Sequence, residues 1–384
     1  MGDTKRHLHI GVNMLSLSPR GGGIWTYCAE LLRELPRLDA NVRYTLFTNA
    51  TALAALDDET RAGFAAIHAI GDERGGRAQL RTYFAPVPWL TRADPPDVFF
   101  SPYVVFPFAR QGKLVVTIHD IVHEDLPDEF PRYSRIVGAQ LTRRAARAAA
   151  HILTVSGYSQ ERIAAVYGVP RERITAIAHG APPRFFDSPT AADLARVWAR
   201  YGVRDPYILA HVTTQPYKNA PMLLEAFAAL RRNLPYDVQL VSYGGMHDGG
   251  DALRARIHAL GIADAVVFAG RVEDADLPAL YHAAAVFAYP SRYEGFGLPV
   301  LEAMASGVPV VTSTAASLPE VAGDAALLVN PHDRDALTVA LRHALTDDAL
   351  RAALIARGLA RARTFTWRTT AERTLATLRR VAEV

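Results

Sequence analysis

The stretch Ser291-Arg-Tyr-Glu-Gly-Phe-Gly-Leu-Pro-Val-Leu-Glu-Ala-Met-Ala-Ser-Gly-Val-Pro-Val310 carries the strongest signal in the chain. The apolar run Ala285–Ala288 before it predicts a strand. A helix is predicted to begin near Leu298 or Pro299, because proline lacks the N–H that the first helical turn leaves unpaired. The amides of residues 295–298 therefore point out of a helix N-terminus, which favours binding of an anion such as phosphate.

Two glutamates flank this predicted phosphate site, Glu294 in the loop and Glu302 one turn into the helix. A carboxylate repels phosphate, but it accepts hydrogen bonds from sugar hydroxyls, each contributing roughly 1.5–3 kcal/mol. Two carboxylates beside a diphosphate site therefore favour a nucleotide sugar, with one acid for each sugar ring. The alternative is a surface loop with scattered acids, which does not explain why strand, glycines, proline and acids coincide.

Length and composition agree with a globular enzyme of two or three domains. The 384 residues are 50% apolar and 21% charged, and the net charge of +3 is too small to indicate a nucleic-acid-binding protein. The single cysteine, Cys28, excludes an internal disulfide and favours a reducing cytosol. No apolar run reaches the length of a signal peptide or a membrane span, so we expect neither.

Short β-rich runs alternate with longer runs of helical period along almost the whole chain. The predicted strands are His9–Leu15, Tyr44–Thr48, Val98–Ser101, Lys113–His119, His151–Val155, Ile174–Ala176, Tyr207–Val212, Val238–Tyr243, Val266–Ala269, Ala285–Ala288 and Val308–Thr312. This alternation predicts parallel sheets with helices on both faces. Because so many strands do not fit one comfortable open sheet, we expect two doubly wound domains, with the break in the proline-containing stretch His179–Arg204.

The signature around residues 291–310 resembles the glutamate–seven–glutamate motif of retaining glycosyltransferases with the GT-B fold, the "glycosyl transferases group 1" family. The resemblance covers nearly the whole chain and is densest from Tyr207 onward. It implies an α/β protein of two doubly wound, Rossmann-like parallel-sheet domains that face each other across a cleft. It also implies that Glu294 contacts donor-sugar hydroxyls and Glu302 the ribose hydroxyls. The amides that would hold the diphosphate are those of Gly295, Phe296, Gly297 and Leu298.

The resemblance also predicts the domain boundaries. Residues 1–187 are expected to form the N-terminal, acceptor-side domain, and residues 188–365 the domain that binds the nucleotide sugar. The tail that begins Phe365-Thr-Trp-Arg resembles the family's terminal helix, so residues 366–384 are expected to cross back to the N-terminal domain.

A glycine-rich loop, Leu15–Tyr27, separates the first predicted strand from the first predicted helix. A dinucleotide-binding site would have an acidic residue at the end of the second strand, and the segment Leu46–Ala50 has none, which disfavours NAD. The resemblance instead implies that Gly22 and Gly23 approach the donor diphosphate and the acceptor. A purely structural turn is the alternative.

An apolar strand ends in His119-Asp120, at the edge where open α/β sheets bind ligands. The resemblance to the family's His-Asp pair places His119 near the donor sugar and the bond to be cleaved. We expect Asp120 to orient the imidazole. His123 lies close enough in sequence to suggest a metal site, but no glycine-flanked acidic cluster accompanies it, so no metal is predicted.

The loop after the strand at Tyr207 contains Lys218-Asn219, which matches the family's lysine that contacts the leaving diphosphate. Related sequences usually have a glycine early in this loop and an arginine beside the lysine. This chain has His211-Val212 and Tyr217 there, so one expected cation is missing. Arg292, close to Glu294 in the other loop, is a candidate substitute. The alternative is that Lys218 is a solvated lysine in a surface loop without a role in binding.

The segment Phe268–Pro278 resembles the family's base-binding turn, in which Gly270, Arg271 and Val272 frame the nucleobase; a structural turn is an equal alternative.

The expected activity is retaining transfer of a hexosyl unit, mannose or a similar sugar, from a nucleoside-diphosphate sugar to a saccharide or lipid-linked saccharide in bacterial surface polysaccharide synthesis. GDP-mannose is the first candidate donor, no further cofactor is expected, and the predicted catalytic residues are His119, Lys218 and Glu294. The alternatives are a nucleotide-sugar epimerase, a phosphorylase of the same fold, and a nucleotide-sugar-binding protein without transferase activity.

The protein is expected in the cytoplasm, either free or bound peripherally to the inner face of the cytoplasmic membrane. A predicted helix at Pro131–Ala149 has arginines on one side, and three aromatic residues lie upstream. The basic side is formed by Arg143, Arg144 and Arg147, and the upstream aromatics are Tyr83, Phe84 and Trp89. The alternative is an ordinary helix with solvated arginines and its apolar side packed on the sheet.

Overall fold

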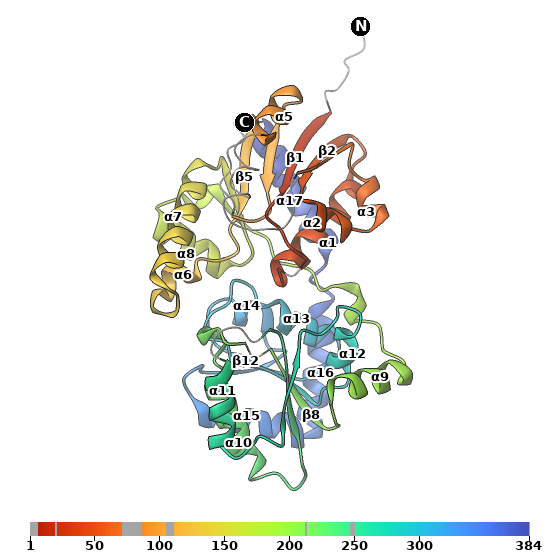
Figure 1. Cartoon of the computed structure of the whole chain (residues 1–384), viewed down its shortest axis with the longest axis vertical. Coiled ribbons are helices and arrows are strands. Elements are labelled where there is room, and N and C mark those ends of the chain that lie inside the picture. The colour runs from red at the N-terminus through yellow and green to blue at the C-terminus, as the bar shows by residue number, and fades with distance from the viewer. Residues whose placement is uncertain are drawn as a thin grey trace. The chain divides into compact units, whose positions relative to one another are not determined.

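The computed structural model describes residues 7–19, 21–70, 86–104, 111–211, 213–245 and 250–383. The chain forms two compact units, the first from Met1–Gly180 with Thr366–Val384 and the second from Ala181–Phe365 (Figure 1). Each unit is a parallel sheet with helices around it. Both sheets are doubly wound, because in each one the strand order runs outward in both directions from the unit's first strand.

The first unit contains a seven-stranded sheet in the order β3-β2-β1-β4-β5-β6-β7, with every pairing parallel. Its strands are β1 (Leu8–Met14), β2 (Val42–Thr48), β3 (Ala66–Ala69), β4 (Val98–Ser101), β5 (Lys113–Thr117), β6 (His151–Thr154) and β7 (Ile174–Ala176). Its helices are α1 (Gly23–Leu38), α2 (Ala50–Ala54), α3 (Asp58–Ala62), α5 (Pro86–Ala93), α6 (Val122–Asp125), α7 (Arg132–Ala148), α8 (Gly157–Tyr167) and α17 (Trp367–Glu383), with short 3₁₀ turns at Pro127–Glu129 and Arg171–Arg173.

The second unit contains a six-stranded parallel sheet in the order β10-β9-β8-β11-β12-β13. Its strands are β8 (Tyr207–Ala210), β9 (Gln239–Tyr243), β10 (Val266–Gly270), β11 (Val286–Tyr289), β12 (Val310–Ser313) and β13 (Leu327–Val329). Its helices are α9 (Ala191–Tyr201), α10 (Ala220–Arg231), α11 (Gly250–Ala259), α12 (Leu277–His282), α13 (Leu298–Ala305), α14 (Leu318–Ala322), α15 (Arg334–Thr346) and α16 (Asp348–Ala362), with 3₁₀ turns at Pro183–Phe185 and Pro216–Lys218.

All eleven strands predicted from the sequence are present, with ends that differ by at most two residues. The structure adds two strands that were not predicted, β3 and β13. Both lie at an edge of their sheet and are only three or four residues long, so they leave little apolar pattern to detect. No helix within the described ranges combines the length and apolar character needed to cross a membrane.

The segment Ala181–Asp187 packs within the second unit, although the sequence prediction grouped it with the first domain. The ring of Phe185 is fully buried against Tyr281, and its carbonyl accepts a hydrogen bond from Nε2 of His282 at 3.0 Å. The chain therefore enters the second unit directly after Gly180.

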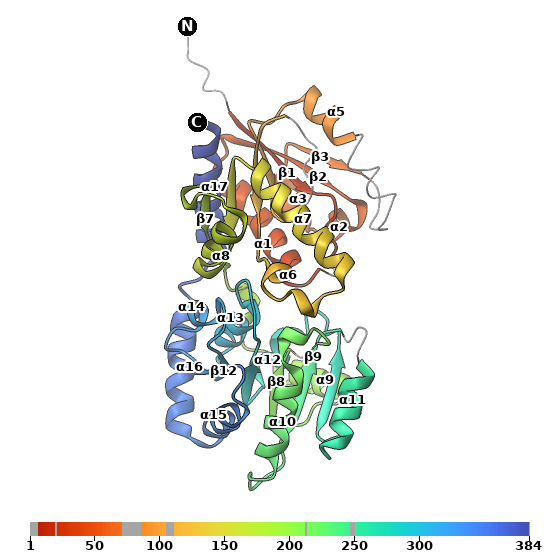
Figure 2. The same ribbon diagram turned by 90° about the vertical axis from the view of Figure 1, so that its left-hand side faces the viewer.

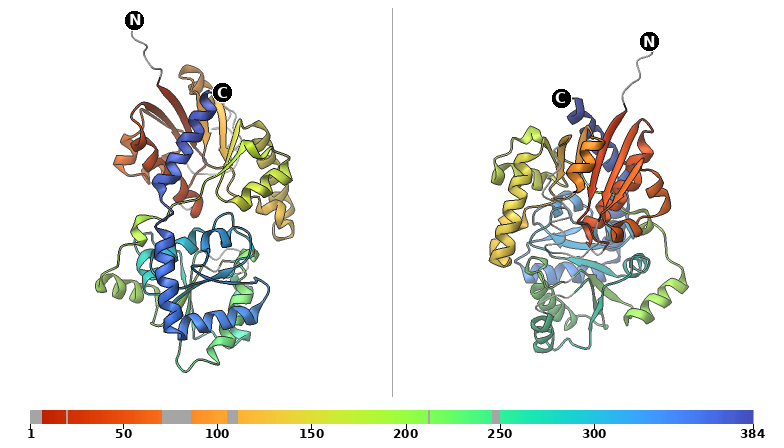
Figure 3. Two further views of the ribbon diagram at one scale, coloured as in Figure 1. Left: turned by 180° about the vertical axis from the view of Figure 1, so that it is seen from behind. Right: turned by 45° about the horizontal axis from the view of Figure 1, so that its top comes forward.

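The C-terminal helix α17 belongs to the first unit, where it packs beside α1 and against the strands β4 and β5 (Figure 3, dark blue). Trp367, at the start of α17, is buried and stacks on the ring of His179 with a centroid distance of 5.6 Å. Gly180 makes this approach possible. A Cβ atom at Gly180 would lie 2.2 Å from the backbone nitrogen of Trp367.

We expect Gly180→Ala to destabilise the first unit, because the added methyl group meets backbone atoms that cannot rotate away. Overpacking of this kind costs about 1–3 kcal/mol, and about 1 kcal/mol corresponds to 2–4 °C in a domain of this size. Thermal unfolding should show a melting temperature several degrees lower. Gly23→Ala is the matched control, because nothing lies within 4 Å of a Cβ there. Equal melting temperatures for the two variants would contradict this packing.

Candidate active site

The ends of β8 and β11 meet at the carboxyl edge of the second sheet. The two strands are parallel neighbours, but β9 continues the sheet on one side and β12 on the other. Loops that leave such strands turn to opposite faces, and open α/β sheets bind ligands at this topological switch point. The loop at 211–219 follows β8, and the loop at 290–297 follows β11.

Hydrogen bonds hold the two loops together. The carbonyl oxygen of Tyr217 accepts from the backbone N–H of Arg292 at 2.7 Å and from Oγ of Ser291 at 3.0 Å. Nδ2 of Asn219 donates to the carbonyl of Pro290 at 3.0 Å. Asn219 has a left-handed backbone with φ 64°, which asparagine tolerates better than most residues. The position of one loop is therefore set by the other.

Lys218 and Glu294, two of the predicted catalytic residues, form an ion pair between these loops. Nζ of Lys218 lies 2.8 Å from Oε1 of Glu294, and the two side chains are 10% and 12% exposed. The same ammonium donates to the hydroxyl of the buried Tyr289 at 2.6 Å. An ammonium has three N–H donors, and the third has no partner among the described residues. The lysine is thus held in place with one donor available.

The loop from Gly295 to Leu298 leads into α13 with its backbone fixed by one side chain. Oγ of Ser317 is hydrogen-bonded to the carbonyls of Glu294 and Phe296, at 2.9 and 2.8 Å. Gly297 has φ 106°, and a Cβ there would lie 2.7 Å from Cδ2 of Leu318, so only glycine fits.

No side chain caps the N-terminus of α13, which begins at Leu298. The amides of Gly297 and Leu298 donate to no other described residue. Helix N-termini of this kind favour anions, because unpaired N–H groups and the helix dipole point the same way. An uncapped helix start one residue past the Glu294 loop agrees with the predicted diphosphate position.

Glu302 lies in α13 and is almost fully buried. The hydroxyl of Tyr281 donates to its Oε2 at 3.2 Å, and the hydroxyls of Tyr281 and Tyr243 are hydrogen-bonded to each other. Burial raises the pKa of Glu302 to about 7, although the charge of Arg184 and the bond from Tyr281 oppose the rise. The carboxyl group therefore changes protonation near neutral pH.

His211 stands early in the loop, where related sequences usually have a glycine, and it does not supply the missing cation. Its ring packs near Tyr243 and Tyr289, with centroid distances of 4.8 and 6.3 Å. Burial, together with the charge of Lys218, lowers the pKa of His211 to about 3, so the imidazole is neutral at physiological pH. Its Nδ1 is buried and has no hydrogen-bond partner among the described residues. Val212 lies outside the described residues.

Tyr217 stands beside Lys218, and its ring centroid lies 5.4 Å from the lysine Nζ. Arg292 remains the candidate for the second cation, because its backbone is bonded to Tyr217. The loops therefore bring Arg292 to the same part of the switch point as Lys218.

The predicted base-binding turn follows β10. Gly270 ends the strand with φ 65°, Arg271 is exposed and Val272 is buried. The carbonyl of Gly270 accepts from the N–H of Gly244 at 2.8 Å, which ties the turn to the end of β9.

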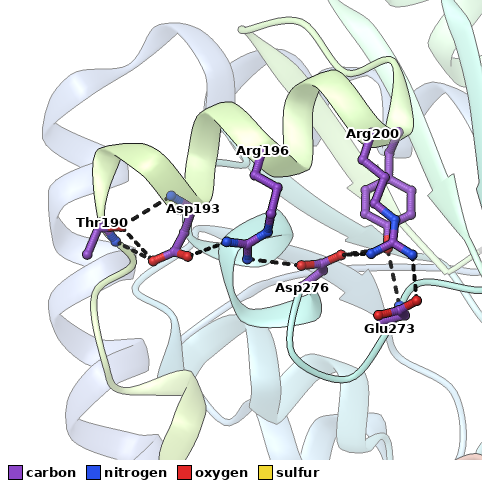
Figure 4. Close-up of polar contacts among 7 residues, drawn as sticks. Thr190, Asp193, Arg196, Arg200, Glu273 and Asp276 are labelled. Carbon is purple, nitrogen blue, oxygen red and sulfur yellow. Dashed lines mark hydrogen bonds and ion pairs between the residues drawn. The ribbon is translucent and has the colours of Figure 1, made fainter.

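A cluster of charged side chains fixes the far end of this turn (Figure 4). The buried carboxylate of Asp276 accepts from Arg196 and Arg200 of α9, each at 3.0 Å, and from the hydroxyl of Tyr201 at 2.8 Å. Burial raises the pKa of Asp276, but the bonds from Tyr201 and Arg196 more than offset this, so its pKa is lower than usual. Arg200 also pairs with Glu273 at 2.5 Å. The cluster binds α9 to the residues directly after Val272.

In the first unit, the glycine loop after β1 leads into α1. Gly22 occupies the N-cap of α1 with φ 59°, no side chain caps this helix, and nothing lies within 4 Å of a Cβ at Gly22 or Gly23. The hydroxyl of Tyr103 accepts from the N–H of Ser16 at 2.7 Å, which joins the loops after β1 and β4 at the switch point of this sheet.

His119 follows β5, and its imidazole is held by a different group from the one expected. Its Nε2 lies 2.9 Å from the carbonyl of Pro102, so Nε2 carries the proton and Nδ1 is the acceptor. Burial lowers the pKa of His119 to about 4, which keeps the ring neutral. The expectation that Asp120 orients the ring is wrong, since Asp120 instead accepts from the backbone N–H of Val122.

Sequence reasoning did not identify Tyr289, Ser317 or Tyr281 as site residues. Tyr289 lies in a strand and Tyr281 in a helix, where a sequence pattern assigns an aromatic residue to the hydrophobic core. Ser317 lies after the next strand, where no motif marks it. Only their contacts with Lys218 and Glu302 and with the loop carbonyls reveal them.

Two family models match this chain, one in each unit. The model described as "Glycosyl transferases group 1" matches residues 202–361, and the model "Glycosyltransferase Family 4" matches residues 21–185.

Two of the similar curated proteins are named as bacterial mannosyltransferases. The chain is 34% identical to O-antigen chain mannosyltransferase B of Escherichia coli over 282 residues, 73% of each chain. It is 26% identical to O-antigen chain mannosyltransferase RfbU of Salmonella typhimurium over 341 residues, 86% of this chain and 90% of the relative.

A solved structure with the same fold is HepE of Anabaena in complex with UDP-glucose. It matches 97% of this chain and 99% of its own with a TM-score of 0.74, at 21% sequence identity. The two Rossmann-like sheets, the motif at the second switch point and these matches together identify the chain as a glycosyltransferase with the GT-B fold that belongs to the glycosyl transferases group 1 family.

Proposed function

We propose that the protein transfers a hexosyl unit, mannose first among the candidates, from a nucleoside-diphosphate sugar to a saccharide or lipid-linked saccharide, with retention of anomeric configuration. The observation that carries the proposal is the Lys218–Glu294 pair beside the uncapped start of α13. The ammonium and the helix amides form an anion site, and a carboxylate lies next to it. A nucleotide sugar has a diphosphate next to sugar hydroxyls, which fits this arrangement.

The proposed roles follow from the position of each group. Lys218, the α13 amides and Arg292 bind the diphosphate, Glu294 accepts from donor-sugar hydroxyls, and Glu302 accepts from the ribose. The nucleobase lies against Gly270, Arg271 and Val272. The role of His119 near the donor sugar rests on the family resemblance alone. The donor requires no further cofactor in this proposal.

The acceptor hydroxyl attacks C1 of the donor sugar from the same face of the ring that the diphosphate leaves. The bond from the sugar C1 to the diphosphate oxygen breaks, and a bond from C1 to the acceptor oxygen forms. The departing diphosphate oxygen takes the proton of the acceptor hydroxyl. Glu294, the carboxylate closest to Lys218, is already engaged by the ammonium, which favours this route over a covalent intermediate on a carboxylate. The preorganised cations stabilise the charge that develops on the leaving group.

The choice of mannose and of a surface polysaccharide product rests on the two relatives, which are named as O-antigen chain mannosyltransferases. The choice of a nucleotide sugar is supported by the UDP-glucose bound in the Anabaena neighbour. The cytoplasm, where nucleotide sugars are made, is the proposed location, with the enzyme at the membrane when its acceptor is lipid-linked.

Incubation with a panel of nucleotide sugars tests the proposed function. Slow hydrolysis should occur with GDP-mannose or a related donor, and NMR of the first product should show the α anomer when the donor is α-linked. Tight binding without turnover would mark a binding protein instead. Interconversion of the sugar without release of the nucleotide would mark an epimerase.

Lys218→Ala and Glu294→Gln are each expected to lower kcat/KM by about 10²–10³, because each removes one preorganised partner of the transition state. Steady-state kinetics checks this, with Glu225→Gln as the matched control. Glu225 belongs to the same unit and is paired with Arg256 on the surface, so its loss should leave the rates unchanged. The double variant should lose less than the product of the single losses, since the two residues act together. Near-normal rates in a folded Glu294→Gln enzyme would contradict the site.

Glu302→Gln is expected to raise the donor KM more than it lowers kcat, because ribose contacts are similar in the ground and transition states.

The same variant should change the dependence of stability on pH. The folded-state pKa of about 7 lies above the usual 4.5, so the native state resists ionisation as pH rises. Folding therefore loses stability between about pH 4.5 and 7, by at most about 3 kcal/mol. Glu302→Gln should be more stable than the wild type at pH 8, and the gain should vanish at pH 4.5. Urea unfolding at the two pH values measures this, and a gain independent of pH would contradict the buried carboxyl.

A further inference from the structure

Helix α7 lies on the outside of the first unit (Figure 2), and it exposes large apolar side chains to solvent. The side chains of Tyr133, Ile136 and Val137 are 81%, 55% and 39% exposed. They make up half of the six large apolar side chains that are exposed in the described part of the chain. Their spacing of three and four residues places them side by side on one face of the helix. Exposed large apolar side chains that cluster in this way indicate a contact surface.

The same face of α7 continues toward its C-terminus with basic side chains. Three exposed residues lie on this face seven, eleven and fourteen positions after Tyr133: Gln140, Arg144 and Arg147. The helix contains five arginines and no aspartate or glutamate along its whole length. At about 1.5 Å per residue, the row from Tyr133 to Arg147 is about 20 Å long, with an apolar first half and a basic second half.

This face differs from the one expected from the sequence. Arg143 turns toward its own unit, where it lies 3.4 Å from Glu124 and over the ring of Tyr167. Tyr83 and Phe84 lie outside the described residues, and so does the side chain of Trp89. The apolar part of the surface is therefore supplied by α7 itself.

We propose that the face of α7 formed by Tyr133, Ile136, Val137, Arg144 and Arg147, here called the α7 face, docks the protein on an anionic lipid bilayer. The apolar side chains enter the boundary between headgroups and acyl chains, and the arginines bind lipid phosphates. A second copy of the chain is a poorer occupant, because it would bring two arginine-rich helices without acidic partners together. The purpose of the contact, to reach a lipid-linked acceptor, rests on the proposed function.

Sedimentation with sucrose-loaded vesicles tests the α7 face. Vesicles of 70% phosphatidylcholine and 30% phosphatidylglycerol should pellet the full-length protein in 50 mM NaCl, and vesicles of phosphatidylcholine alone should not. Raising NaCl to 0.5 M should release most of the bound protein, because salt screens the attraction. Arg144→Gln with Arg147→Gln should weaken binding about tenfold or more, since each cation near the surface contributes about fivefold.

Matched controls separate the α7 face from general charge and apolarity. Arg357→Gln with Arg363→Gln removes the same charge from exposed positions in the second unit and should leave binding unchanged. Ile136→Ser should weaken binding severalfold, whereas Val339→Ser, at a position 43% exposed on α15, should not. Equal pelleting with neutral and anionic vesicles would overturn the proposal, and so would equal losses in the test and control pairs. A dimer in sedimentation velocity that Ile136→Ser dissociates, without vesicle binding, would also overturn it.

A fluorescent label reports the contact directly. Cys28 is the single cysteine and is buried, so a cysteine introduced at Val137 can be labelled selectively. An environment-sensitive dye at Val137→Cys should shift to the blue on addition of the anionic vesicles, whereas the same dye at Val339→Cys should not shift. An unshifted dye at Val137→Cys, under conditions where the protein pellets, would assign the binding to another surface.

Donor hydrolysis without vesicles distinguishes a failure of this proposal from a failure of the proposed function. The α7 variants should hydrolyse the donor at the wild-type rate, since α7 carries no donor-binding residue. Wild-type hydrolysis without vesicle binding would overturn the docking surface alone. Vesicle binding without any hydrolysis would leave the docking surface standing and contradict the transferase.

Discussion

The loops after β8 and β11 are held against each other at the point where the winding of the second sheet reverses. The carbonyl of Tyr217 takes hydrogen bonds from two residues of the opposite loop, and the ion pair of Lys218 and Glu294 lies beside them. Strand order brings these loops together, since β8 and β11 are parallel neighbours that are far apart in the chain. The rest of the site depends on this junction, because the start of α13 and the position of the lysine both follow from it.

The junction also explains why a charge can be kept so nearly buried. A lysine that is 10% exposed would be costly alone, but a carboxylate and a tyrosine hydroxyl satisfy two of its three donors. In the proposed function, the remaining donor is the one that binds the donor phosphate. Glu302 shows the opposite solution. Its carboxyl group is buried and accepts a hydrogen bond from the hydroxyl of Tyr281, and burial raises its pKa to about 7. The two carboxyl groups of one motif therefore have different surroundings, since that of Glu294 is paired with an ammonium and that of Glu302 is buried beside a tyrosine hydroxyl.

Much of the fold could be predicted from the sequence, because the interior strands are apolar on both faces. The run Val115–Thr117 is fully buried and reads as a strand without ambiguity. The edge strand β3, Ala66–Ala69, is largely part-exposed, so its pattern is indistinct. The site was predicted where motifs combine rare residues at fixed spacing, as in the loop from Glu294 to Pro299. Sequence reasoning missed a common residue in a common element, as with Tyr289, whose hydroxyl accepts from Nζ of Lys218.

The hydrogen-bond partner of a candidate residue was harder to predict than the candidate residue itself. His119 was selected because it follows a strand, but its hydrogen-bond partner is the carbonyl of Pro102 and not the adjacent Asp120. Backbone carbonyls carry no sequence signature, so a hydrogen bond to one of them is invisible until the chain is folded. The exposure of Tyr133 and Ile136 on α7 could not be predicted either, since an apolar residue on an amphipathic helix is normally assigned to the core.

In the proposed function, the switch point of the second sheet binds the diphosphate of a nucleotide sugar through Lys218. Calorimetric titration of the wild type and of Lys218→Ala with a nucleoside diphosphate, and with the corresponding nucleoside alone, tests it most directly. We expect Lys218→Ala to weaken diphosphate binding by about tenfold or more, since bonds to charged groups contribute roughly 1.5–3 kcal/mol, and to leave nucleoside binding unchanged. Diphosphate binding of equal strength in the two proteins would contradict it.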